Sequence, residues 1–235
     1  MSDDKQRRCP VCGEPLVRIG ITKDTCGICG KVFSKEDLCS ADHKVCPECR
    51  GSMTVDTINK VCSSSSSRDP YEILTEIMSE PPMRMHDAKH HMAVGSALLA
   101  AYRNSGGVAD LDNALKEIQK RGSSAPPGAC GFIGNCGAAV SAGAFYSVVT
   151  GASPYSEGAQ WGDVNMLTGK CLMAMAEIGG PRCCKRNSFI AIGTAVEQVG
   201  DKLGIKMEYL EKIECGFSDR NEECIKEKCK FYVKK

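Results

Sequence analysis

The chain has few aromatic residues, no excess of one charge and no long apolar run. Phe, Trp and Tyr make up 6% of its 235 residues, so it offers little of the aromatic surface on which proteins stack nucleic-acid bases. The formal net charge is +1, which provides no global field for nucleic acid. The longest apolar run, residues 92–102, is too short and too interrupted to span a bilayer. We therefore expect no nucleic-acid partner and no membrane segment.

The first residues also lack the apolar stretch of a secretory signal, because charged residues lead directly into a Cys-x-x-Cys pair. We expect a cytoplasmic protein whose thiols stay reduced. The sixteen cysteines then favour metal binding over disulfides, above all where they stand as close pairs.

The cysteines fall into two groups, eight within residues 1–62 and eight within residues 130–229. A serine-rich stretch, residues 63–68, is typical of a linker. Residues 1–62 have too few large apolar side chains to fold on a core of their own, so bound metal must stabilise them. We expect residues 1–62 to form a two-site zinc-ribbon-like domain and residues 69–235 to form a mainly helical, cysteine-rich domain.

The apolar spacing after residue 69 is that of helices, without a sustained alternation of strands and helices, so the predicted fold class is mainly α. Asp69-Pro70 is typical of a helix start, and Pro81-Pro82 ends the same helix. The only strand-like stretch there is residues 206–213. Further helices are predicted over residues 86–102, 111–121, 136–150, 166–178 and 188–203.

Close cysteine pairs predict two structural zinc sites in residues 1–62. Two residues between cysteines let both thiolates face one ion, and a following glycine permits the turn that aims backbone N–H groups at sulfur. The first site is predicted from Cys9, Cys12, Cys26 and Cys29, with a rubredoxin-like iron as the alternative.

The second zinc site is predicted from Cys39, Cys46, Cys49 and Cys62. His43 could replace one of these cysteines, or it could be an exposed loop histidine. The order Cys-x3-His-x2-Cys-x2-Cys is also found at the centre of a cross-braced RING finger. A further cysteine pair is missing, so we discount ubiquitin ligation.

Two glycine-rich segments carry a second kind of cysteine site. Three thiolates from such loops suit an iron–sulfur cluster whose fourth iron stays open to substrate. We predict Cys130, Cys136 and Cys183 as the cluster ligands. Cys184 is predicted to be a catalytic thiol, or the third ligand in place of Cys183. The alternative is two buried structural cysteines beside a redox or phosphate-binding pair.

Three cations flank the adjacent cysteines Cys183 and Cys184 in the sequence. Arg182, Lys185 and Arg186, together with a helix N-terminus, are expected to lower the thiol pKa and to hold an anionic substrate.

Histidines gather upstream of these segments. His86 and His90 are four residues apart and share a helix face, so we predict that they act as acid–base catalysts together with the thiol of Cys184. The alternative is a polar helix start at the surface. A zinc protease is poorly supported, because the required glutamate is missing. The tail cysteines could hold a third metal or a second cluster, or be buried thiols: Cys215, Cys224 and Cys229.

Three motifs stand together in this chain: MRMH at residues 83–86 followed by two histidines, PGACGFIGNCG at 127–137 and GGPRCCKR at 179–186. In these motifs the chain resembles a cysteine-rich family of unassigned function from anaerobic archaea and bacteria, sometimes joined to methyltransferase-like domains. The resemblance covers most of residues 9–200. It implies an anaerobic metalloprotein without an assigned reaction.

The favoured function is an iron–sulfur metalloprotein acting as an enzyme of anaerobic sulfur or one-carbon metabolism, with two Zn²⁺ ions and one cluster. One alternative is a zinc-ribbon binding module or assembly factor that docks on a larger enzyme. Another is a metal-free thiol redox or sulfur-transfer protein using Cys183 and Cys184. Expected partners are a larger protein or a second copy, bound through the N-terminal domain, and an anionic small molecule.

Overall fold

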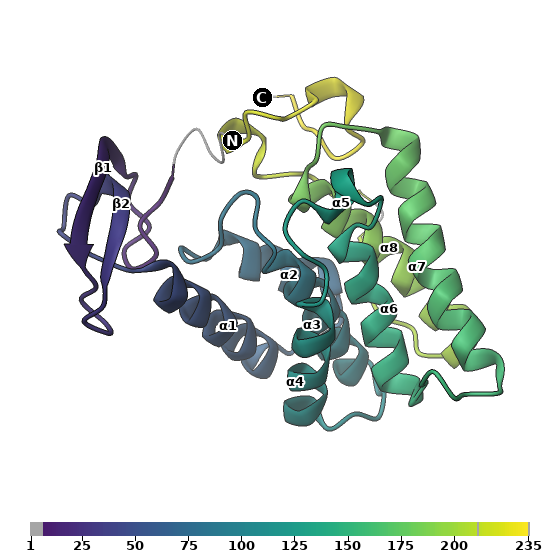
Figure 1. Ribbon diagram of the computed structural model, residues 1–235. Coiled ribbons are helices and arrows are strands. Elements are labelled where there is room, and N and C mark those ends of the chain that lie inside the picture. Colours follow the sequence, from purple (N-terminus) through teal and green to yellow (C-terminus); the bar gives the residue numbers. More distant parts are fainter. Residues whose placement is uncertain (1–6, 211, 235) are drawn as a thin grey trace.

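The computed structural model describes residues 7–210 and 212–234. Within them the fold is mainly helical, as predicted, with eight α-helices and one two-stranded sheet (Figure 1). The strands are β1 (Val17–Thr25) and β2 (Val32–Leu38). The helices are α1 (Pro47–Ser64), α2 (Pro70–Ser79), α3 (His90–Asn104), α4 (Leu111–Gly122), α5 (Ala129–Phe132), α6 (Gly137–Thr150), α7 (Ala159–Ile178) and α8 (Cys184–Leu203).

Helix α3 forms the centre of the helical bundle, and residues 93–102 are all buried. It packs closely against α6 and α4 because small residues face each other. At Gly95 a Cβ atom would lie 2.6 Å from Ile118 Cγ2 and 2.8 Å from the carbonyl oxygen of Ser141. A side chain at this position would therefore force the helices apart.

Helix α1 was not predicted. Cys46 caps its N-terminus and Pro47 occupies the first turn, a favourable start for a helix. Further along, Ile58, Val61 and Cys62 share one buried face that packs against the bundle. The stretch predicted as a linker thus begins inside the last turn of α1, and the domain division itself remains a prediction.

The sheet lies at one end of the molecule, and α1 leads from it to the bundle (Figure 1). Its strands are antiparallel, with Val17 opposite Leu38 and Thr25 opposite Val32, and the register shifts between Arg18 and Thr22. The ion pair between Arg7 and Asp37, 2.9 Å long, ties the incoming chain to β2.

The last predicted helices begin earlier than expected. Helix α7 starts at Ala159 and α8 at Cys184, which makes Cys183 the N-cap of α8. The strand predicted over residues 206–213 is wrong for the described residues 206–210 and 212–213, which form no strand; Glu211 lies outside the described part. The tail instead crosses the end of the bundle at the start of α8 (Figure 1). None of the helices described here combines the length and apolar character needed to cross a membrane.

Candidate functional site

Two four-residue groups in the N-terminal part could each hold a metal ion. In each group the four ligand atoms lie within 4.8 Å of one another. Metal group A contains Cys9, Cys12, Cys39 and His43. Metal group B contains Cys26, Cys29, Cys46 and Cys49.

The spacing within both groups fits a tetrahedral ion. Tetrahedral Zn²⁺ with bonds of about 2.3 Å to sulfur places its sulfur ligands about 3.8 Å apart. The Sγ atoms of Cys12 and Cys39 are 3.7 Å apart, as are those of Cys29 and Cys46. His43 Nδ1 lies 3.6 Å from the Sγ atoms of both Cys9 and Cys39. The chain therefore offers two compact donor sets of the sulfur and imidazole type.

Backbone N–H groups support the sulfur atoms of metal group B. The N–H of Cys46 donates to Cys26 Sγ over 3.4 Å, and the N–H of Cys49 donates to Cys46 Sγ over 3.4 Å. The first of these bonds is the main cause that lowers the pKa of Cys26 to about 6. A lowered pKa favours the thiolate, the form that binds metal.

The predicted division of the ligands between two sites is wrong. The structure joins the first pair with the third and the second pair with the fourth, so the two groups interleave in a cross-braced manner. His43 completes metal group A, whereas Cys62 is fully buried in the apolar core beside Ile58 and Val61. The sequence contained a signal for this: Cys39-x3-His43 is itself a ligand pair, the third of four along the chain, and Cys62 fits the apolar spacing of a helix.

The other predicted site residues meet in one cavity of about 240 Å³, here called the cysteine–histidine pocket. It is lined by the segment before α3, by α5 with the loop before it, and by the starts of α6 and α8. Of the residues predicted for a cluster or for catalysis, all line it: His86, His90, Cys130, Cys136, Cys183 and Cys184.

The two histidines each present one bare nitrogen. Asn221 Oδ1 accepts from the backbone N–H of Glu223, so it is the oxygen, and His86 Nε2, 3.0 Å away, must carry the proton it donates. His90 Nδ1 lies 2.8 Å from the carbonyl oxygen of Asp87 and must likewise donate. His86 Nδ1 and His90 Nε2 are then buried lone pairs without a hydrogen-bond partner. Burial lowers the pKa of both imidazoles, which favours their neutral form.

The adjacent cysteines Cys183 and Cys184 face different neighbours. Cys183 Sγ accepts from the backbone N–H of Arg186 over 3.4 Å and from Asn221 Nδ2 over 3.5 Å. Burial raises the pKa of Cys183, and the thiol of Cys229 adds to the rise. Burial also raises the pKa of Cys184 to about 12, with the thiols of Cys183 and Cys136 nearby. The expected lowering of these pKa values is therefore wrong, because burial outweighs the helix N-terminus and the nearby cations.

Two of the three predicted anion-binding cations point elsewhere. Lys185 is fully buried, and its Nζ lies 3.3 Å from the carbonyl oxygen of Arg84 and 4.7 Å from the centre of the Phe217 ring. Arg186 donates to the carbonyl oxygens of Gly179 and Pro181 over 2.8 Å each. Neither lines the pocket, so their assignment to a substrate in this pocket is corrected.

Only Arg182 of the three lines the pocket, and it pairs with Glu223 over 3.3 Å. Asn221 contacts His86 and Cys183, and Glu223 pairs with Arg182. Both residues come from the tail and were not predicted. Asn221 is 6% exposed. Single polar residues in an irregular segment carry no periodicity, so the sequence offered no signal for them.

The comparisons with known proteins place this part of the chain in a family. Residues 58–232 match the sequence model of a family of unknown function (DUF5714). The match includes every residue of the cysteine–histidine pocket and the tail cysteines, and it excludes both metal groups. No curated protein and no solved structure matches the chain. Because the match spans well over half of the sequence, the chain belongs to this family of unknown function.

Proposed function

We propose that this protein is an iron–sulfur metalloenzyme that acts on a small anionic molecule in the cysteine–histidine pocket. The observation that carries the proposal is the meeting of three separate motifs on one cavity, which is lined by thiols and by two histidines that each have one buried nitrogen without a hydrogen-bond partner. Sulfur and nitrogen donors of this kind suit iron and other thiophilic metals rather than hard cations.

Cys130, Cys136 and Cys184 are the proposed cluster ligands. Cys130 is exposed on α5 and Cys136 caps α6, and Asn187 Nδ2 donates to Cys136 Sγ over 3.4 Å. N–H donors of this kind tune iron–sulfur clusters. Cys184 takes the place predicted for Cys183, because its thiol has Cys136 as a neighbour whereas Cys183 is held by the tail.

A cluster held by these three thiolates would have one iron without a protein ligand, which could bind substrate as the open position of catalytic zinc does. His86 Nδ1 and His90 Nε2 are proposed to accept and return protons there, since both residues line the cavity and both nitrogens lack a hydrogen-bond partner. Arg182 is the proposed contact for an anionic group. The reaction class that follows is anaerobic chemistry of a small sulfur or one-carbon acid.

Metal groups A and B are proposed to hold structural zinc. Each has four protein ligands and no open position, which is typical of structural rather than catalytic zinc.

The test is iron analysis of the full chain purified without oxygen, with absorbance measured at roughly 400 nm, where thiolate-bound clusters absorb. The variant Cys136→Ala should lose iron bound in the pocket. Cys171→Ala is the matched control, since this buried thiol lies in α7 within the core. Equal iron in Cys136→Ala and the control would rule the pocket cluster out.

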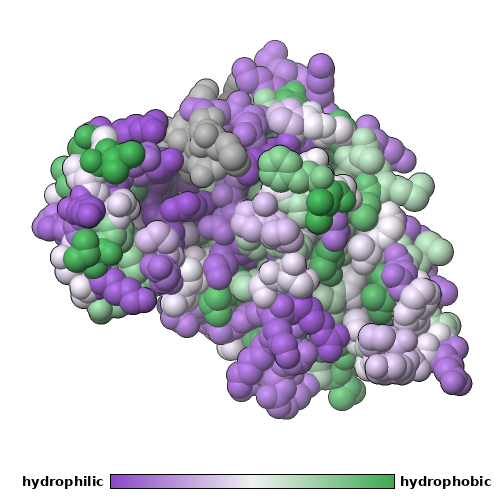
Figure 2. All heavy atoms as spheres, viewed as in Figure 1, coloured by the Kyte–Doolittle hydropathy of each residue, from purple (hydrophilic) through white to green (hydrophobic). Residues whose placement is uncertain are grey.

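A second proposal concerns the hairpin, which exposes apolar side chains. Val17, Ile21 and Val32 are 62%, 78% and 67% exposed. Figure 2 shows hydrophobic residues on the surface of this end of the molecule. Such a surface favours docking on another copy or on a larger enzyme. If two copies associate through the hairpin, Ile21→Lys should lower the molar mass that light scattering measures at high protein concentration. An unchanged mass would contradict self-association through this surface.

A further inference from the structure

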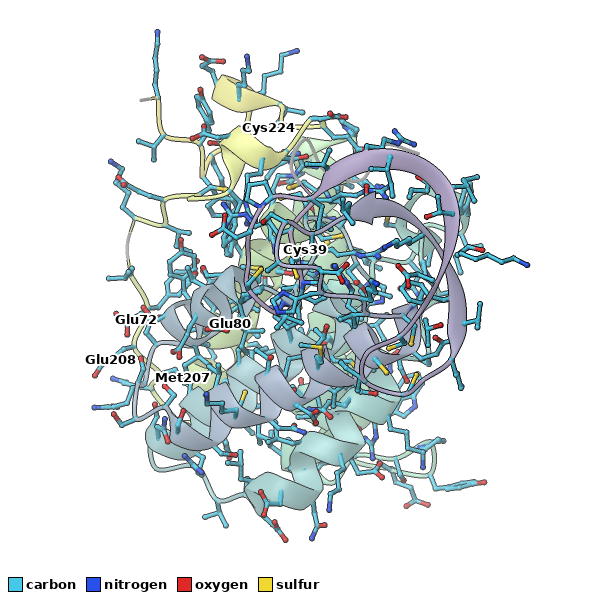
Figure 3. The ribbon with its side chains drawn as sticks, turned by 90° about the vertical axis from the view of Figure 1, so that its left-hand side faces the viewer. Cys39, Glu72, Glu80, Met207, Glu208 and Cys224 are labelled. Atoms are coloured by element: carbon cyan, nitrogen blue, oxygen red, sulfur yellow. The ribbon has the colours of Figure 1, made fainter. Side chains whose placement is uncertain are left out.

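A second cysteine cluster lies on the other side of Cys183, outside the cysteine–histidine pocket. A small, mainly apolar cavity is lined by four cysteines together with Phe189, Phe217 and Phe231. The cysteines are Cys183, Cys215, Cys224 and Cys229. Figure 3 shows Cys224 in the tail, well away from Cys39 of metal group A. We propose that these four cysteines bind a [4Fe–4S] cluster, distinct from the pocket cluster and independent of it.

The first support is the convergence of the four thiols. Cys215 has the thiols of Cys183, Cys229 and Cys224 as electrostatic neighbours. Among the described residues, the four sulfur atoms do not form a set as tight as metal groups A and B. A cluster spreads its thiolates over separate iron atoms, so this wider arrangement suits a cluster better than a single ion.

The second support is the set of N–H groups aimed at sulfur. Cys215 Sγ accepts from the N–H of Phe217 and Cys224 Sγ from the N–H of Lys226, each over 3.4 Å. Cys183 Sγ accepts from Arg186 and Asn221, as described above. Hydrogen bonds to the sulfur atoms are one of the means by which proteins set the potential of iron–sulfur clusters.

The third support is the buried amine of Lys185. It is fully buried, and no carboxylate of the described residues forms an ion pair with it. Its electrostatic neighbours are the thiols of Cys184, Cys183 and Cys215 together with the guanidinium of Arg220. A buried cation without a negative partner is destabilising. A cluster of thiolates and iron supplies the negative charge that is otherwise missing beside this amine.

A cluster with four cysteine ligands has no open iron, so it carries electrons rather than binding substrate. When reduced by dithionite, the oxidised cluster gains one electron, and no bond to the protein forms or breaks. Because Cys183 and Cys184 are adjacent, such an electron would arrive one residue from the proposed pocket cluster.

The experiment uses the full chain, reconstituted with iron and sulfide without oxygen, and three sets of variants. The double variant Cys224→Ser/Cys229→Ser should lose about four iron atoms per chain and one signal in electron paramagnetic resonance after dithionite reduction. The double variant Cys130→Ala/Cys136→Ala should keep that signal. Cys171→Ala should match the unmodified protein.

These arms separate the two proposals. The tail cluster is supported if the signal is lost in Cys224→Ser/Cys229→Ser and kept in the other two variants, whether or not the pocket holds iron. Unchanged iron in the tail variant, or zinc in place of iron, overturns the tail cluster and leaves the pocket untouched.

A second variant keeps the test valid if the tail variant does not fold. Lys185→Met keeps the length of the side chain and removes its charge. Because a nearby cation favours the more negative, reduced cluster, this change, made in the Cys130→Ala/Cys136→Ala background, should shift the reduction potential of the remaining signal to more negative values. The surface variant Lys202→Met should leave it unchanged. A potential that is the same in Lys185→Met and the unmodified protein would contradict a cluster beside this amine.

Discussion

His86 is held by Asn221, a residue 135 positions away, through a hydrogen bond of 3.0 Å from Nε2 to Oδ1. The same amide donates through Nδ2 to Cys183 Sγ over 3.5 Å. One buried side chain of the tail therefore orients an imidazole that lines the cysteine–histidine pocket and a thiol at the start of α8. The tail completes the site rather than merely covering it.

Replacing Asn221 with alanine should loosen both partners. Asn221→Ala removes the hydrogen-bond acceptor of His86 Nε2 and leaves it a longer contact of 3.6 Å to the Glu223 carboxylate, so the free energy of unfolding should fall by about 1–3 kcal/mol. Urea unfolding under anaerobic conditions measures the change. The control Asn165→Ala, whose side chain is exposed on α7, should stay within about 0.5 kcal/mol of the unmodified protein. Equal effects of both substitutions would show that Asn221 has no such role.

Zinc content distinguishes the interleaved ligand sets from the arrangement expected from the sequence. His43→Ala removes one ligand of metal group A, so zinc should fall from about two ions per chain to about one. Cys62→Ala should keep about two ions, because this thiol lies in the core. Zinc is measured with a chromophoric chelator after the thiols are modified. The opposite result, with zinc lost only in Cys62→Ala, would restore the sequential pairing.

The glycine-rich segment offers a matched pair of substitutions. At Gly137 an added Cβ would overlap the imidazole ring of His91, whereas at Gly131 nothing lies within 4 Å of such an atom. Gly137→Ala should therefore destabilise the protein by about 1–3 kcal/mol and lower its iron content. Gly131→Ala should resemble the unmodified protein in both respects. Thermal unfolding and iron analysis test the pair, and a stable, iron-loaded Gly137→Ala would refute the close packing of His91.

Much of the helical bundle follows from local sequence. The sequence predicts α4 and α6 to within one residue at each end: α4 has Asp110 as its cap and one apolar face, and α6 is a run of small and apolar residues after the glycine-rich loop. Helix α1 escapes prediction because its polar first half hides the short apolar face around Ile58, which becomes stable only against the bundle.

The candidate site, too, has a part that the sequence predicts and a part that depends on tertiary packing. The motifs around Cys130, Cys136 and Cys184 can be recognised in the sequence because cysteines there stand among several glycines. In the structure these cysteines line one cavity. Which thiol faces which partner depends on packing between distant segments. For that reason the neighbours of Cys183, the place of Lys185 in the core and the role of Asn221 emerge only from the folded chain.

The most direct test of the central claim is the metal content of the full chain purified and kept without oxygen. An iron–sulfur enzyme of the proposed kind should contain about two zinc ions and roughly eight iron atoms per chain, with broad absorbance at roughly 400 nm. Protein that is folded, loaded with zinc and free of iron after anaerobic reconstitution would contradict it.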